Sequence, residues 1–378
     1  MDIEKKNTQL VPIRNTQLIK LQNTISLTNR LVFKGIEDIF NEAFYLINSK
    51  DINRDSENFC LLLEINPLYL KEKKFNYKAR SEADYLTAIE LFSKAIEINH
   101  GYKFSYSGRG IAKCSLKDYE GAIFDFTKAI EIDPNFAQAY SNRGIAKRGL
   151  KNFDGAISDY SKAIEIDPNL AVTYNARGIA KKELKDYEGA ISDYNKAIEI
   201  DPNYSIAYYI RGNAKLNLKD FEGAISDYSK TIEIDPNYIN AYNNRGVAKY
   251  ELNDYKGAIF DYNKAIEIDP NYSSAYYNRG NARKIFNDYE GAISDYSKAI
   301  EIDPNYSIAS STRGNAKQGL KDFEGAILDY TTAIEFDPND ANTYNNRGVA
   351  KKELKDYEGA ISDYNKAIEI DPKLCTSL

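Results

Sequence analysis

Residues 175–202 read NARGIAKKELKDYEGAISDYNKAIEIDP, and almost the same letters return at residues 345–372. The proline that closes this stretch recurs with a strict spacing of 34 residues. It stands at positions 134, 168, 202, 236, 270, 304, 338 and 372. A fixed period of this size is typical of a solenoid of stacked supersecondary units, in which neighbours bury the apolar face that one unit alone leaves open. The sequence therefore predicts a repeat array rather than a set of separate globular domains.

The copy at residues 137–170 shows the pattern within each unit. In its second half, apolar residues follow the i, i+1, i+4, i+7, i+8 spacing of an amphipathic helix, and Pro168 ends that helix. Asn152 stands just before the helix, where its side chain can cap the first free N–H groups. Small residues such as Gly144 and Ala156 allow two helices to approach closely. We therefore predict a helix–turn–helix in every repeat.

The period divides the chain into four parts. Residues 1–35 do not fit it, and their apolar spacing is compatible with a helix that caps the first edge of the stack, with a disordered arm as the alternative. Residues 36–102 hold two degenerate copies, as terminal repeats often do. Eight regular copies fill residues 103–374, and residues 375–378 form a short tail.

The repeat resembles the tetratricopeptide repeat. The resemblance rests on the 34-residue period, an aromatic residue followed by glycine in the first helix, Ala-x-x-x-Tyr-x-x-Ala in the second helix, and the closing proline. It covers residues 103–374 at full strength and reaches back to residue 36 in weaker form. It implies an all-α fold, namely a right-handed superhelical α-solenoid of antiparallel helix pairs. In that family the first helix of each repeat lines a concave groove that binds an extended peptide or a partner helix.

Every regular copy departs from the general family pattern by carrying arginine in its first helix, and every copy carries aspartate in its second. A guanidinium beside the packing face needs a carboxylate, because an unpaired buried charge is very costly. We predict Arg–Asp pairs with a structural role, either within one repeat or between neighbours. The arginines are Arg109, Arg143, Arg177, Arg211, Arg245, Arg279, Arg313 and Arg347. The aspartates are Asp125, Asp159, Asp193, Asp227, Asp261, Asp295, Asp329 and Asp363.

The composition disfavours several functions. A formal net charge of −6 offers no basic stripe for a phosphate backbone, so we expect no nucleic-acid partner. One histidine, His100, and three widely spaced cysteines predict no metal site, no disulfide framework and no cofactor. No run is apolar enough for membrane insertion and no signal peptide is seen, so we expect a cytoplasmic protein. Phosphate-loop and nucleophile motifs do not occur, so we expect no enzymatic activity.

The positions that face the groove in the family vary between copies here, while the framework stays constant. Asparagine amides at these positions can hold a peptide backbone, or alternatively they solvate the groove or stabilise the helix locally. Apolar and aromatic side chains of the central copies are the expected contact centre, because such anchors supply most of the energy at interfaces. That centre is Tyr209, Ile210, Leu216, Tyr250 and Tyr277. The full predicted groove set is Asn142, Asn175, Tyr209, Ile210, Asn213, Leu216, Asn243, Asn244, Tyr250, Tyr277, Asn278 and Asn281.

The leading hypothesis is a non-catalytic scaffold that binds a protein or peptide segment in this groove. One alternative is a structural solenoid that self-associates through the apolar face following the last repeat, around Ile361 and Tyr364. Another is a targeting subunit for an enzyme on a different chain. The Lys/Asn/Arg clamp with which some relatives bind a C-terminal carboxylate is not reproduced at matching positions.

Overall fold

The computed structural model describes residues 82–373, and the regular structure within that range is helical, without strands. Seventeen helices, α2 to α18, follow one another there. The predictions for residues 1–35, for the first degenerate copy and for the tail at 375–378 lie outside the described residues. The all-α solenoid class predicted from the 34-residue period is confirmed.

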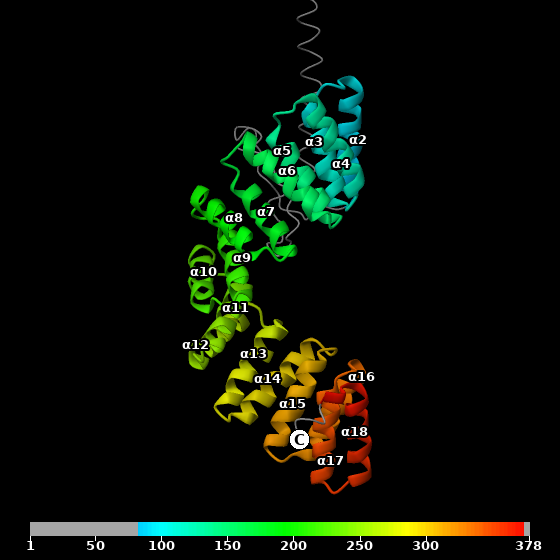
Figure 1. The fold of residues 1–378 in the computed structure, drawn as a ribbon, viewed down its shortest axis with the longest axis vertical. Helices are drawn as coiled ribbons and strands as arrows, with labels where there is room; N and C mark the ends of the chain where they lie inside the picture. Colours follow the sequence, from blue (N-terminus) through cyan, green and yellow to red (C-terminus); the bar gives the residue numbers. More distant parts are fainter. Residues whose placement is uncertain (1–81, 374–378) are drawn as a thin grey trace, which may run out of the picture. The chain divides into compact units, whose positions relative to one another are not determined.

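The described residues form two units, each of which is a stack of consecutive helices (Figure 1). Unit 1 ends at Asp186 and unit 2 begins at Tyr187. The helices of unit 1 are α2 (Glu82–Ile98), α3 (Lys103–Ser115), α4 (Tyr119–Ile132), α5 (Ala137–Gly149), α6 (Phe153–Ile166) and α7 (Ala171–Glu183). The helices of unit 2 are α8 (Tyr187–Ile200), α9 (Ser205–Asn217), α10 (Phe221–Ile234), α11 (Ile239–Glu251), α12 (Tyr255–Ile268), α13 (Ser273–Ile285), α14 (Tyr289–Ile302), α15 (Ser307–Gly319), α16 (Phe323–Phe336), α17 (Ala341–Glu353) and α18 (Tyr357–Ile370).

From α3 onward, odd-numbered helices are the first helix of a repeat, here called helix A, and even-numbered helices are the second, helix B. Within each unit, helix B packs against helix A of its own repeat and against helix A of the next. Helix α12, for example, lies between α11 and α13. Packing on both sides buries the apolar face of each amphipathic helix.

A left-handed residue makes the sharp turn between helix A and helix B. In the turn after α15 this residue is Lys321, with φ 62°. Its N–H donates to the Gln318 carbonyl at 2.9 Å, and the next N–H donates to the Lys317 carbonyl at 3.0 Å, which satisfies carbonyls at the end of the helix. The Asp322 side chain then accepts from Gly325 N–H at 2.9 Å and caps α16. Equivalent left-handed residues are Lys117, Lys151, Lys185, Lys219, Asn253, Asn287 and Lys355.

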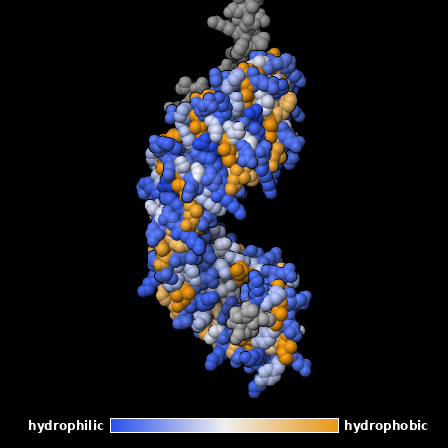
Figure 2. Space-filling model, viewed as in Figure 1, coloured by the Kyte–Doolittle hydropathy of each residue, from blue (hydrophilic) through white to orange (hydrophobic). Residues whose placement is uncertain are grey.

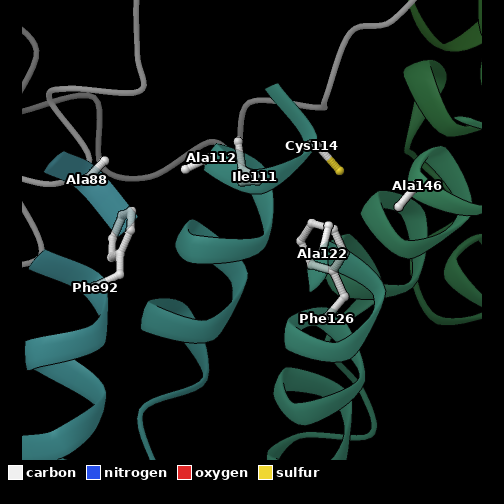
Figure 3. Close-up of a cluster of buried hydrophobic side chains, with 8 residues drawn as sticks. All are labelled: Ala88, Phe92, Ile111, Ala112, Cys114, Ala122, Phe126 and Ala146. Atoms are coloured by element: carbon white, nitrogen blue, oxygen red, sulfur yellow. The ribbon is translucent and has the colours of Figure 1, made fainter. Parts of the chain in front are cut away.

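The core of each repeat consists of alanines and one large ring from helix B. Figure 3 shows the start of unit 1, where Phe92 points from α2 toward α3 and Phe126 of α4 lies near Ala146 of α5. Both rings are fully buried. In unit 2 the ring is a tyrosine that lies on the helix-A glycine. A Cβ placed on Gly246 would stand 2.6 Å from the Tyr262 ring, so the backbone of α11 approaches that ring too closely for any side chain.

The surface is mainly hydrophilic on the face shown in Figure 2, with hydrophobic residues scattered over it. None of the helices among residues 82–373 has both the length and the apolar character needed to cross a bilayer. Scattered apolar residues are ordinary for a folded chain and do not by themselves mark a docking surface.

Candidate functional site

The inner faces of the A helices of unit 2 are the candidate site, and neighbouring A helices contact one another there. Helix α9 packs against α11, α11 against α13, and α15 against α17. Most of the predicted groove residues lie on these helices. We call the helix-A surface from α9 to α17 the inner face.

The structure buries several residues that the sequence placed in the groove. Ile210 is 4% exposed and Asn243 is 5% exposed, so neither offers a contact surface in unit 2. In unit 1, Asn142 is fully buried and Asn175 is 4% exposed. The sequence could not separate these positions from their accessible equivalents, because side-chain size in the neighbouring repeat decides how much of each is covered.

Asparagines of the inner face join one A helix to the next. Asn244 Nδ2 of α11 donates to the Tyr209 hydroxyl at 3.2 Å and to Asn213 Oδ1 at 3.0 Å, both on α9. Asn278 Nδ2 of α13 donates to Asn243 Oδ1 of α11 at 3.0 Å. In all three hydrogen bonds the donor amide bonds to the preceding A helix. This favours a local, stabilising role for Asn244 and Asn278 over direct contact with a peptide.

A second group of asparagines keeps its donors available. Asn213 Oδ1 accepts from the Tyr228 hydroxyl at 2.8 Å as well as from Asn244, and Asn281 Oδ1 accepts from the Tyr296 hydroxyl at 2.8 Å. These bonds orient each amide with its oxygen toward the protein. Within the described part of the chain, no hydrogen bond uses Nδ2 of Asn213 or Asn281. Each amide therefore has two N–H groups for an external acceptor.

The predicted aromatic anchors are half-buried and held by ring contacts. The Tyr209 ring centroid lies 4.8 Å from that of Tyr238, and the Tyr277 centroid lies 5.2 Å from that of Tyr306. Tyr250 packs edge-to-face on Tyr255 at 5.1 Å. Leu216 packs in the same cluster as Tyr209, at the border of α9 and α11. Tyr209 and Leu216 therefore share one cluster, whereas Tyr250 packs in the cluster of the Tyr262 ring and Tyr277 in that of the Tyr296 ring.

Arginine and aspartate meet within one repeat. In the repeat at 239–272, Arg245 Nε donates to Asp261 Oδ2 at 2.9 Å and Nη2 donates to Oδ1 at 2.7 Å. The same two-bond contact joins Arg109 to Asp125, Arg143 to Asp159, Arg211 to Asp227, Arg279 to Asp295, Arg313 to Asp329, and Arg347 to Asp363. Arg177 and Asp193 belong to different units, and Arg177 donates to Ser161 at 3.1 Å within unit 1.

Two partners of this pair were missed by the sequence reasoning. Lys249 Nζ lies 2.8 Å from Asp261 Oδ2, so the fully buried carboxylate has two cations around it. Arg245 Nη1 donates to Ser229 Oγ of the preceding helix B at 3.0 Å, which ties the pair to the neighbouring repeat. The sequence does indicate both partners. In the regular copies the Lys249 position is always Lys or Arg, and the Ser229 position is always Ser, Thr or Asn.

Burial also affects the titration of the inner tyrosines. Loss of hydration raises the pKa of Tyr228, Tyr262, Tyr296 and Tyr330 well above the ordinary value for phenols, because the phenolate is the form that burial disfavours. These rings are therefore neutral donors over the whole physiological range. Among residues 82–373 no group of three His, Cys, Asp or Glu side chains is arranged to hold a metal ion.

Comparison with protein families matches the repeats directly. A model described as "Tetratricopeptide repeat" matches residues 137–170, 171–204, 239–272, 273–306 and 341–374. A model described as "TPR repeat" matches residues 110–151, 212–253 and 314–355, and a further tetratricopeptide model matches residues 193–226. Together these matches cover residues 110–306 and 314–374, which is well over half of the chain.

Two solved structures share this fold with TM-scores of 0.50 or above. The APC/C hetero-tetramer Cut9–Hcn1 aligns with TM-score 0.51 at 15% identity, over 70% of this chain and 52% of that chain. The C-terminal part of a TPR repeat-containing protein from Cytophaga hutchinsonii aligns with TM-score 0.50 at 21% identity, over 60% of this chain and 93% of that chain. YrrB, described as a TPR protein with an unusual peptide-binding site, aligns with TM-score 0.43 at 25% identity, over 50% of this chain and 96% of YrrB. A search of curated proteins found no match.

Proposed function

The chain belongs to the tetratricopeptide repeat family of protein-interaction scaffolds, and from that premise we propose that it binds an extended peptide segment along the inner face of unit 2, without catalysis of its own. On the inner face of unit 2, side chains differ between otherwise similar repeats. A scaffold that recognises one partner needs such variation, because a uniform surface would bind the same group at every repeat.

One observation carries this proposal. Asn213 and Asn281 stand at the same helix-A position, and each turns two N–H donors away from its own repeat. Asn315 is arranged in the same way, since its Oδ1 accepts from Tyr330 at 2.8 Å and from Asn346 at 3.0 Å. A row of amide donors beside half-buried rings suits an extended chain, whose carbonyl groups need donors and whose side chains need apolar contact.

The test uses peptides selected from a phage-displayed library against the immobilised full chain. Each selected peptide is then titrated against two variants with an aromatic residue removed. Tyr250→Ala removes a half-buried ring of the inner face, whereas Phe260→Ala removes a ring on α12 that is 56% exposed. We expect Tyr250→Ala to weaken binding by about tenfold or more, as for an interface anchor, and Phe260→Ala to leave it unchanged.

Circular dichroism of both variants checks that the repeats remain folded. Equal affinity of the two variants for the peptide, or weaker binding by Phe260→Ala alone, would show that the peptide does not bind on the inner face. Failure to select any peptide would remove the groove hypothesis for this chain.

A specific observation also favours a second candidate, self-association through α18. Helices α14 and α18 differ at one position, Ser297 in the first and Asn365 in the second. In α14, Ile293 is half-buried beneath the next helix A, whereas its equivalent in α18, Ile361, is 59% exposed. The same chemical face is therefore covered in one helix and open in the other. We propose that two copies of the chain bury this face against each other.

Light scattering across a range of protein concentrations tests the second candidate. The parent chain is expected to form dimers that Ile361→Glu converts to monomers, because the new carboxylate cannot be buried in an apolar contact. Leu328→Glu, on α16, is the matched control, since that side chain is 66% exposed on another helix B. A parent chain that stays monomeric at every concentration excludes the proposal.

A further inference from the structure

We propose that the inner face at α11 and α13 contains a subsite for a carboxylate of the bound peptide, formed by the Lys284 ammonium and the hydroxyls of Tyr250 and Tyr277. This inference rests on the proposed function, because it names the chemistry of a segment that the groove would hold. The three side chains are donors without acceptors, grouped on two neighbouring A helices.

Lys284 is an unpaired cation in a partly desolvated position. It lies near the end of α13 and is half-buried, and no ion pair or hydrogen bond within the described residues involves its ammonium. Desolvation lowers the pKa of Lys284, and no neighbouring carboxylate raises it. The lysines one position earlier in the neighbouring repeats are paired. Lys249 and Lys317 each contact the buried aspartate of their own repeat at 2.8–2.9 Å.

The tyrosine hydroxyls supply further donors beside this cation. Tyr277 and Lys284 are seven residues apart on α13, so they project from the same side of the helix, two turns apart. Tyr250 occupies on α11 the position that Lys284 occupies on α13, and α11 packs against α13. Desolvation is the main cause that raises the pKa of Tyr250, and the nearby side chains of Tyr255, Glu251 and Tyr277 add to it. Neither the Tyr250 nor the Tyr277 hydroxyl donates to a described residue.

The architecture of the repeat does not require a cation at the Lys284 position. Leu216 and Tyr250 stand at the same position in the two preceding repeats, and both pack as ordinary half-buried side chains. The side chain of Gln318, in the next repeat, lies 3.0 Å from the Tyr330 hydroxyl and so is tied to its own helix B. The fold therefore does not need a charge at this position. The half-buried Lys284 ammonium is a donor that a ligand in the groove can use.

A carboxylate is the group that such a site selects. A lysine ammonium offers three donors and a phenol one, and an ionised carboxylate accepts from all of them with two oxygens. Asn281 adds its free Nδ2 donors one turn from Lys284 on the same helix. Since the chain carries a net charge of −6, acidic peptides are not attracted to it in general, so recognition of an anion here depends on this local cluster.

The experiment compares amidated nonapeptide pools with glutamate or with glutamine at a fixed central position, all other positions being randomised. Binding of each fluorescent pool to the full chain is titrated in low salt, where a partly exposed ion pair contributes most. We expect the glutamate pool to bind about five- to tenfold more tightly than the glutamine pool, a range between exposed and fully buried ion pairs. Lys284→Met is expected to abolish the difference, because an apolar side chain already fits this position in neighbouring repeats.

Lys352→Met is the matched control, since Lys352 is the exposed residue at the equivalent position of α17. It should leave the glutamate preference intact, and Tyr250→Phe should reduce it two- to threefold.

A third pool with a free C-terminal carboxylate and no glutamate separates the two sources of the anion, and preference for either source supports the subsite. Equal binding of the charged and neutral pools, with Tyr250→Ala still weakening both, overturns the subsite and keeps the groove. Binding of no pool overturns both.

Discussion

Arg245 and Asp261 form a two-bond contact inside one repeat, with Nε–Oδ2 at 2.9 Å and Nη2–Oδ1 at 2.7 Å. The guanidinium also stacks over the Tyr242 ring, with its carbon 5.6 Å from the ring centroid, and donates to Ser229 in the preceding repeat. One side chain therefore fixes helix A to helix B of its own repeat and to helix B of the repeat before it. We propose that the pair has a structural role, since it recurs in seven repeats, each time with a Ser, Thr or Asn partner on the preceding helix B.

Arg245→Leu tests this role. The variant leaves the fully buried Asp261 carboxylate with Lys249 as its remaining cation, so we expect the free energy of unfolding to fall by about 2–4 kcal/mol, somewhat below the full cost of an unpaired buried charge. Urea unfolding followed by circular dichroism gives the value. Lys230→Ala removes a surface pair with Glu233 and should leave stability close to that of the parent, because water screens exposed pairs. Stability of Arg245→Leu equal to that of the parent would refute the structural role.

Gly246→Ala tests the close approach of α11 to its partner ring. The added methyl group would stand 2.6 Å from Tyr262, so either the ring or the helix must shift, at a cost of about 1–3 kcal/mol. Thermal or urea unfolding measures the loss. The control is Ser226→Ala on the exposed side of α10, which should be neutral or slightly stabilising because alanine is the better helix former. If Gly246→Ala behaves like the control, the glycine is not needed for packing.

The helix pairs could be predicted from the sequence because the framework positions of the 34-residue period keep the same burial state in nearly every copy. Ala258 and Tyr262 illustrate this, since both are buried and both have equivalents buried in the other described repeats except the last, where the tyrosine is half-buried. The pairing of Arg with Asp could also be anticipated from the cost of isolated charge. These inferences depend on identity between copies.

The inner face was less predictable because there the copies differ. Whether Asn244 donates to a peptide or to Asn213 depends on the distance between successive A helices, which no pattern within one repeat reveals. Ile210 and Leu216 looked equally suitable as anchors, yet Ile210 is buried and Leu216 is half-buried. Contacts between neighbouring repeats decide which of these side chains is buried, and the sequence of a single repeat does not reveal those contacts.

The turn after α15 provides a stabilising prediction. Lys321 adopts φ 62°, a conformation that costs an L-residue with a Cβ atom about 1–2 kcal/mol and glycine almost nothing. Lys321→Gly is therefore expected to raise the free energy of unfolding by about 0.5–1 kcal/mol, after the greater entropy of glycine in the unfolded chain is subtracted. Lys321→Ala is the control, because it removes the lysine side chain but keeps the strain. Equal stability of the glycine and alanine variants would show that the turn relaxes by other means.

The buried tyrosines predict how stability depends on alkaline pH. Burial raises the pKa of Tyr228, Tyr262 and Tyr296 above the value of 10.0 that an unperturbed phenol has. Above pH 10 the unfolded chain then loses phenolic protons that the folded chain retains, so the unfolded state binds fewer protons and the free energy of unfolding decreases as pH rises. Below pH 10 this contribution is constant, since every phenol is protonated in both states.

Tyr262→Phe isolates one of these groups. Phe126 and Phe92 occupy the same position in unit 1, and the Tyr262 hydroxyl makes no hydrogen bond within the described residues, so we expect a change below about 1 kcal/mol at pH 8. Between pH 9 and pH 11 the variant should lose less stability than the parent in urea titrations, because one raised phenol is gone. Tyr357→Phe, at a position 59% exposed, should retain the steeper pH dependence of the parent. Identical pH profiles for the parent and Tyr262→Phe would mean that the Tyr262 phenol titrates equally in the folded and unfolded states, contrary to its burial.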